Sequence, residues 1–188
     1  MSYSFDCQRL IEATGVLLKA VAPHRMSRLR LIKLLYLADR DSIRETGFPI
    51  TGDAVYAMDN GPVLSRTYDC IKGSDYYAKE WGRFFRNSGP RDVELLEDPG
   101  VAMLSRGQVE LLQLTSRKFE DYDDWRLVEY THELPEWKAN RPRSGSAQRI
   151  PARCILEAVG LTNAADAILA DATAYRRAEK LLRTSGER

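Results

Sequence analysis

The sequence has few of the features that mark a secreted or membrane-bound protein. Its three cysteines are far apart and odd in number, whereas a secreted disulfide framework needs a denser, even set. No stretch approaches the roughly 18 consecutive apolar residues of a membrane helix. The first residues carry Asp6, Arg9 and Glu12 where a signal peptide needs an apolar core. We therefore expect a cytoplasmic protein without a membrane partner.

An excess of one charge sign is also missing, since the formal net charge is only +1. That balance argues against a protein that binds nucleic acid through its overall charge. The chain has 188 residues, of which 44% are hydrophobic and 29% are charged. It can therefore bury a substantial core, either as one domain or as one domain with a modest extension.

Residues typical of catalytic and metal sites are scarce. The two histidines and three cysteines form no CxxC or HxxxH pair that would hold zinc. Without a GxSxG motif, the only nucleophile and base that can be combined are Cys70 and His132. His132 also ends a predicted helix, where an imidazole interacts favourably with the helix dipole. We therefore expect no enzyme activity and no metal or cofactor. A hydrolase that uses Cys70 and His132 remains a third hypothesis, beside the two given at the end of this section.

Helical periodicity and helix-boundary residues dominate what is present. Apolar residues recur at helical spacing from 28 to 45, between Ser27 as N-cap and Gly47 as C-cap, which predicts a largely buried helix. Ser105 and Gln108 have the spacing of a capping box, and Ser4 is a candidate cap for the first helix. Further helices are predicted at about 5–20, 65–72, from 105 onward, 124–133 with Asp123 as cap, 151–159 and 162–183.

The last predicted helix is amphipathic. Its apolar side chains are expected to face the body of the protein: Ile168, Leu169, Ala172, Tyr175, Leu181 and Leu182.

Strand signals are fewer. The aromatic run 81–85 and the segment 93–96 flank a turn at 88–90, which predicts a β-hairpin. Residues 54–58 favour another short strand. The chain is therefore predicted to be an α+β protein, predominantly helical, with about six to seven helices and a small antiparallel β-sheet.

The segment GFPITGDAVYAMDNGPVLS, residues 47–65, is rich in glycine and proline. Its glycines match neither the GxxxxGK[ST] of a P-loop nor the GxGxxG of a dinucleotide site. Asn60 and Gly61 tolerate positive φ, and Pro62 fixes φ just before the next predicted helix. The segment is therefore interpreted as a helix–strand–turn–helix joint that needs no ligand.

Two segments have strong local charge. Residues 138–153 contain five cationic residues and no acid, and residues 120–136 contain seven acids and one base. The basic segment is either a flexible surface loop or a site that neutralises phosphates. The acidic segment lacks the spacing of an EF-hand loop, so its acidic side chains are expected to be solvated, apart from the predicted helix cap Asp123. The alternative is that this acidic face binds a basic partner.

The sequence contains an ordered set of motifs: Lys33-Leu-Leu-Tyr36, the segment from Gly47 to Asp53, the strand from Val55 to Met58, and Gly61-Pro-Val63, followed later by Leu127 to Trp137. This ordered combination resembles the Panacea, or SocA-like, antitoxin domain. The resemblance spans roughly 5–137, and residues 1–137 are taken as the SocA-like domain. Residues 138–188 are then a basic loop and C-terminal helices packed on the same domain. Asn60 and Leu64 depart from the aromatic and proline common around the family's Gly-Pro-Val turn.

The resemblance implies a bacterial or phage-borne antitoxin that neutralises a cognate toxin protein by direct contact, with no catalytic residues and no cofactor. One branch of the family delivers its toxin to a ClpXP-type protease. The residues expected to contact the partner lie in the strand and turn and in the basic loop: Asp53, Tyr56, Asp59, Asn60, Arg141, Arg143 and Arg149. The alternative is a nucleic-acid-associated phage or regulatory protein that uses the 138–153 loop.

Overall fold

The computed structural model describes residues 3–185, and within this range it is an α+β fold made mostly of helices. It has nine α-helices and two three-stranded antiparallel sheets. The helices are α1 (Cys7–Lys19), α2 (Arg28–Thr46), α3 (Ser65–Lys72), α4 (Ala78–Phe84), α5 (Arg106–Lys118), α6 (Asp124–His132), α7 (Pro135–Ala139), α8 (Ala152–Ala158) and α9 (Ala165–Ser185), with the short 3₁₀ turn η1 (Thr162–Ala164). The strands are β1 (Arg25–Ser27), β2 (Val55–Met58), β3 (Gly61–Leu64), β4 (Phe85–Ser88), β5 (Asp92–Leu95) and β6 (Gln148–Arg149).

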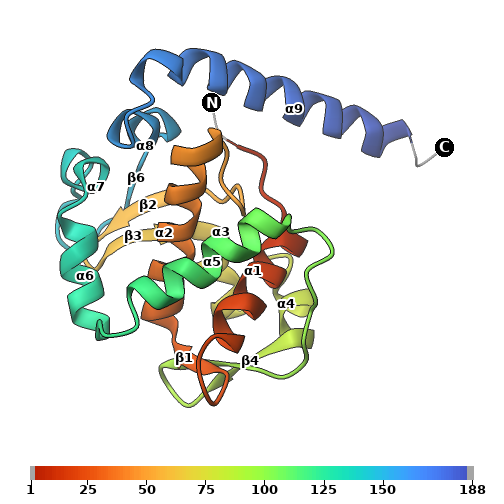
Figure 1. The fold of residues 1–188 in the computed structure, drawn as a ribbon, viewed down its shortest axis with the longest axis vertical. Coiled ribbons are helices and arrows are strands. Elements are labelled where there is room, and N and C mark those ends of the chain that lie inside the picture. Colours follow the sequence, from red (N-terminus) through yellow and green to blue (C-terminus); the bar gives the residue numbers. More distant parts are fainter. Residues whose placement is uncertain (1–2, 186–188) are drawn as a thin grey trace.

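Helix α2 lies at the centre of the molecule (Figure 1). It contacts α1, α5, α6 and α8 as well as strand β3, and its residues from Leu31 to Ala38 are all buried. The predicted boundaries are confirmed, because Ser27 accepts a hydrogen bond from the Arg30 amide and Gly47 ends the helix in the left-handed conformation. The helix therefore forms the core on which the other elements pack.

The two sheets lie at different places around this core. One has the strand order β1-β5-β4 and the other has the order β3-β2-β6. In the second sheet β2 pairs with β3 through a tight hairpin and with β6 on its other edge. A single sheet was expected, so the number of sheets differs from the prediction while the antiparallel pairing agrees with it.

Two extra helices account for the difference from the predicted helix count. The aromatic run 81–85 was expected to be a strand, but most of it belongs to α4, and the strand β4 begins only at Phe85. The ring of Trp81, in α4, packs on that of Phe85, the first residue of β4, at 4.5 Å between centroids. Helix α6 ends at His132, and Pro135 then begins α7, because the first turn of a helix tolerates a proline without an amide hydrogen.

Two local predictions in the N-terminal third are also corrected. The cap of α1 is Asp6 rather than Ser4, since the Asp6 carboxylate accepts a hydrogen bond from the Arg9 amide at 3.1 Å. Residues 61–64 form strand β3 instead of leading directly into a helix. Pro62 is accommodated there because β3 is an edge strand of its sheet. The capping box of Ser105 and Gln108 is confirmed.

The C-terminal helix α9 extends away from the body (Figure 1). Its first half packs as predicted, with Leu169 and Ala172 buried. Tyr175 and Leu181, which were expected to face the body, are 67% and 68% exposed because the helix has run past the core by then. The side chain of Leu182 lies outside the described part of the chain.

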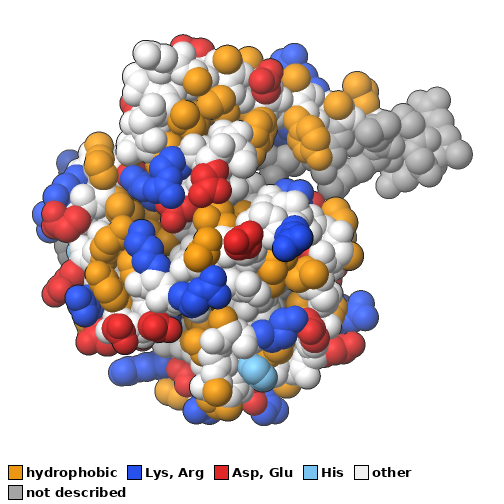
Figure 2. Space-filling view, viewed as in Figure 1, with side chains coloured by type: hydrophobic (Ala, Val, Ile, Leu, Met, Phe, Trp, Pro, Cys, Tyr) orange, Lys and Arg blue, Asp and Glu red, His pale blue; other side chains and the backbone are white. Residues whose placement is uncertain are grey.

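Figure 2 shows hydrophobic side chains along the side of α9 that faces the body. Along residues 3–185, no helix is both long enough and apolar enough to cross a bilayer.

Candidate protein-binding surface

The β2–β3 hairpin is built around a two-residue tip, Asp59–Asn60. Its register pairs Tyr56 with Val63 and Met58 with Gly61. Gly61 has a φ of +93°. A Cβ atom there would lie 2.5 Å from the Thr131 hydroxyl oxygen, so the tip packs directly on α6 and only glycine fits. The hairpin tip is therefore held against the core while both tip residues stay exposed.

Lys33 supports the hairpin from behind. The Lys33 side chain is fully buried, and its Nζ donates a hydrogen bond to the Pro62 carbonyl oxygen at 2.8 Å. Burial lowers the pKa of Lys33 to about 7. Lys33 was not singled out as a buried side chain from the sequence. Its position inside an otherwise apolar helical run was the signal that it is buried.

The basic segment is joined to the hairpin rather than free. Within it, β6 pairs with β2 so that Arg149 lies opposite Tyr56. The Ile150 amide donates to the Val55 carbonyl oxygen at 2.9 Å. The Gly145 amide donates to the Asp59 carboxylate at 2.8 Å. The two groups of residues that the sequence assigned to partner binding therefore form one continuous surface, although residues 142–147 are irregular as expected for a loop.

Six of the seven predicted contact residues have exposed or half-buried side chains on this surface. Tyr56 is half-buried, and the other five are exposed: Asp59, Asn60, Arg141, Arg143 and Arg149. The Arg141 guanidinium lies 5.6 Å from the centroid of the Trp137 ring. The surface thus combines an aromatic ring, a polar tip and three arginine side chains.

Asp53 differs from the other predicted residues because it is only 6% exposed. Its carboxylate accepts hydrogen bonds from the Arg66 and Thr67 amides at 3.0 and 2.8 Å and from the Thr67 hydroxyl at 2.9 Å. It therefore caps the start of α3. Burial raises the pKa of Asp53 above its usual range.

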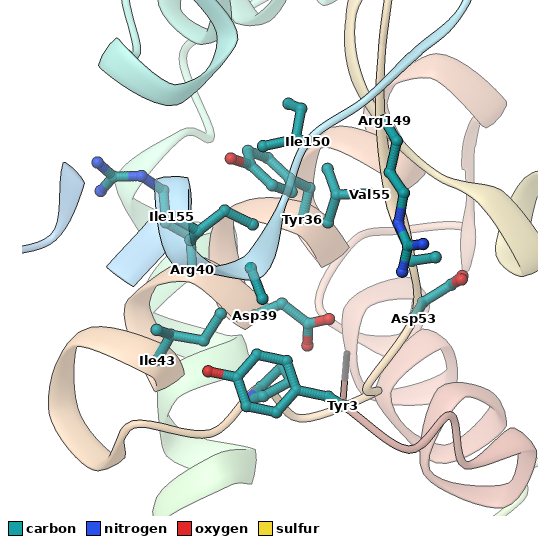
Figure 3. Close-up of a pocket in the computed structure, with 13 residues that line it drawn as sticks. Tyr3, Tyr36, Asp39, Arg40, Ile43, Asp53, Val55, Arg149, Ile150 and Ile155 are labelled. Carbon is teal, nitrogen blue, oxygen red and sulfur yellow. The ribbon is translucent and has the colours of Figure 1, made fainter. Parts of the chain in front are cut away.

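Asp53 and Arg149 line a small cavity of about 30 Å³ between α2, β2 and α8. Figure 3 shows the Arg149 side chain pointing toward Asp53 across this cavity. Asp39 lies on the same cavity and accepts hydrogen bonds from the Ile50 and Thr51 amides, both at 2.9 Å. These contacts fix the chain that leads into β2.

A buried polar group that the sequence did not reveal links α2 to α7. The Glu136 carboxylate accepts hydrogen bonds from the Tyr36 hydroxyl and the Arg40 Nε, each at 2.6 Å. Glu136 was expected to be a solvated acid, but it is only 1% exposed. The expectation was wrong because the first turn of α7 turns this side chain toward α2. Asp123 does cap α6 as predicted.

His132 and Trp137 lie behind the hairpin. Their rings stack at 4.0 Å between centroids, and Trp137 Nε1 donates to the Met58 carbonyl oxygen at 3.3 Å. Burial and the neighbouring Lys33 lower the pKa of His132. The Cys70 thiol is buried, and burial raises its pKa to about 12, so it is protonated at neutral pH and is a weak nucleophile. Within residues 3–185, no group of three or more His, Cys, Asp or Glu side chains is arranged to hold a metal ion.

Comparison with known protein families gives one match. The model of the family described as "Antitoxin SocA-like, Panacea domain" matches residues 31–138, which is more than half of the 188 residues. The chain belongs to this SocA-like antitoxin family. Neither the curated proteins nor the solved structures give a significant match. Membership supports a general role in a toxin–antitoxin system.

The SocA-like motif residues mostly serve the framework of the surface. Lys33, Gly61 and Trp137 hold the hairpin through the contacts described above. Asp53 orders the step from β2–β3 to α3. The match starts at residue 31 and therefore excludes α1, even though Leu10 and Leu17 of that helix are fully buried in the shared core. It also ends before β6, which completes the surface.

Proposed function

We propose that this SocA-like protein is an antitoxin that neutralises a cognate toxin protein by direct binding through the hairpin and the basic loop. The observation that carries the proposal is the pairing of β6 with β2, which joins the hairpin of the family domain to the loop that bears Arg141, Arg143 and Arg149. Membership in an antitoxin family supplies the type of partner.

Neutralisation would occur by steric occlusion of the toxin's active surface. Tyrosine, tryptophan and arginine contribute most to protein interfaces, and Tyr56 and Arg149 lie opposite each other on adjacent strands. The framework beneath them is held by buried hydrogen bonds, so little conformational entropy is lost there on binding. Asp53 contributes by positioning α3, because burial leaves its carboxylate little surface for a partner.

Delivery of the bound toxin to a ClpXP-type protease is a second step that the same binding surface allows. It would lower the amount of toxin as well as mask it. The two mechanisms differ in toxin lifetime. Pulse-chase measurement of the toxin with and without the antitoxin separates them, since occlusion alone leaves the lifetime unchanged.

The test of the proposal is co-expression with the small open reading frame adjacent to its gene. We expect the adjacent product to stop growth, and the SocA-like protein to restore growth and to co-purify with it. The Arg141→Ala/Arg143→Ala variant should restore growth less well. The matched control, Arg106→Ala/Arg117→Ala, removes the same charge from exposed positions on α5 and should act like the wild type. Absence of rescue and of binding by the wild type would refute the proposal.

The exposed arginines also favour a second candidate function, binding of nucleic acid by the basic loop. This function predicts an affinity for oligonucleotides that falls steeply with salt and is lost in the same arginine variant. Fluorescence anisotropy at 50 and 200 mM salt tests it. A weak affinity that is equal in wild type and variant would exclude it.

A further inference from the structure

Beside the hairpin tip lies a groove that shares Asp59 and Asn60 with the proposed binding surface and extends beyond it. Its volume is about 510 Å³, within the range of ligand pockets. It is bordered by the start of α2, the hairpin, α3 and the turn at Gly145–Ser146. The groove therefore adjoins the tip residues Asp59 and Asn60 on one side and opens onto α2 and α3 on the other.

The wall of the groove is apolar and already rigid. Ile32, Val63 and Ile71 each belong to the core and are less than a tenth exposed, yet each lines the groove. Leu29 and Met58 are half-buried, and the exposed Tyr68 also lines the groove. Leu29 and Ile32 belong to α2, and Val63 and Ile71 lie on β3 and α3, which contact α2, so this part of the wall exists before any partner binds. An apolar side chain of a partner would enter it without an ordering cost in this part of the wall.

The rim of the groove carries positive charge. Arg28 and the exposed Lys72 lie on it, and the acid on the rim is Asp59, whose carboxylate already accepts a hydrogen bond from the Gly145 amide. Lys33 lies at the back of the groove. A partner segment that is acidic on either side of its apolar side chain would place its carboxylates opposite this rim.

A second cavity adjoins the groove at the start of α2. Its volume is about 200 Å³, and its lining includes Arg28, Leu29, Arg91, Asp124 and the 64% exposed Trp125. Tryptophan and arginine side chains are frequent among the residues that dominate the binding energy of protein interfaces. Because the two cavities share Arg28 and Leu29, one continuous surface runs from the hairpin tip across the groove to Trp125.

We propose that the groove receives an apolar side chain of the toxin that is flanked by acidic residues, and that this contact anchors the complex. The inference rests on the proposed antitoxin function and specifies the chemistry of the partner. Charge attraction at the rim speeds encounter and selects the partner, and the apolar wall provides the anchor.

The experiment measures the dissociation constant between purified SocA-like protein and the purified product of the adjacent gene by calorimetry. Lys72→Glu reverses a charge on the rim, and Leu29→Ala shortens the apolar wall. We expect each variant to bind at least about tenfold more weakly, with the Lys72→Glu defect reduced at high salt.

Lys118→Glu is the matched control, because Lys118 shares three properties with Lys72. Both are exposed, both end a helix, and both lie about 5 Å from an aromatic ring, Tyr68 for Lys72 and Phe119 for Lys118. The control should bind like the wild type. The urea unfolding midpoint of each variant shows whether it is folded, and Lys72→Glu remains informative if Leu29→Ala is not.

The outcomes separate this inference from the proposed function. If the wild type binds and both groove variants bind within twofold of it, the toxin docks elsewhere, and the inference fails while the antitoxin function stands. If the wild type does not bind at all, both fail. If a labelled oligo-dT strand loses affinity in Lys72→Glu while toxin affinity is unchanged, the groove serves nucleic acid and the inference is wrong.

Discussion

Replacing Gly61 by alanine tests the packing on which the whole binding surface depends. At a φ of +93° an alanine is strained by about 1–3 kcal/mol. The new Cβ would also lie 2.5 Å from the Thr131 hydroxyl oxygen and 3.1 Å from Lys33 Nζ, and such overpacking costs about 1–3 kcal/mol. We therefore expect Gly61→Ala to lower the free energy of unfolding by about 2–6 kcal/mol, a large part of a typical total of about 5–15 kcal/mol.

Urea unfolding followed by circular dichroism measures this loss, and two other glycines separate its causes. Gly89→Ala introduces strain alone, because φ is +63° and no atom lies within 4 Å of the new Cβ. Gly107→Ala, in α5, introduces neither backbone strain nor a close contact, and it should stabilise the protein by up to about 1 kcal/mol. If Gly61→Ala costs no more than Gly89→Ala, the tip does not pack on α6 as described, and the framework argument is refuted.

Three further predictions concern buried polar groups. Glu136→Ala leaves the Arg40 charge without its partner and should lower the free energy of unfolding, measured in urea, by about 3–5 kcal/mol. The control Glu133→Ala changes an exposed residue and should lower it by less than about 1 kcal/mol. Asp53→Ala removes the cap of α3 and should cost about 1–2 kcal/mol, with faster amide exchange in that helix. Burial lowers the pKa of Lys33 from 10.5 to about 7, so between these pH values the unfolded chain binds more protons than the folded protein, and the free energy of unfolding should rise with pH. Lys33→Met should remove this rise. If the pH dependence of stability is the same in this variant, Lys33 is not its source.

Local sequence signals predicted most helix boundaries. Ser27, Gly47 and the pair Ser105 and Gln108 act on backbone groups within four residues of themselves, so their effect depends little on the rest of the fold. The same signals were less informative where two local preferences compete. The aromatic run ending at Phe85 suits both a strand and a helix, and packing decided for α4 over most of it.

The sequence suggested residues for a candidate partner-binding site, but it did not indicate how these residues are arranged. Asp59 and Asn60 were assigned from a turn signal and the three arginines from local charge, without any indication that the two groups meet. The Asp59–Gly145 contact joins positions 86 apart, and nothing in a local pattern encodes such a pair. The groove beside the tip had no sequence signal at all, because its wall consists of ordinary core residues such as Ile32 and Ile71.

The sequence by itself determined the family, the mostly helical character and the positions of the caps, because these follow from short motifs and from interactions within one or two helical turns. Only the tertiary structure decided that β6 completes the hairpin sheet and that Lys33 and Glu136 are buried. The Glu136 carboxylate meets the Tyr36 hydroxyl across 100 positions. Such contacts form only when the chain closes around α2, since burial and pairing depend on which elements share the core and not on the residues adjacent in sequence.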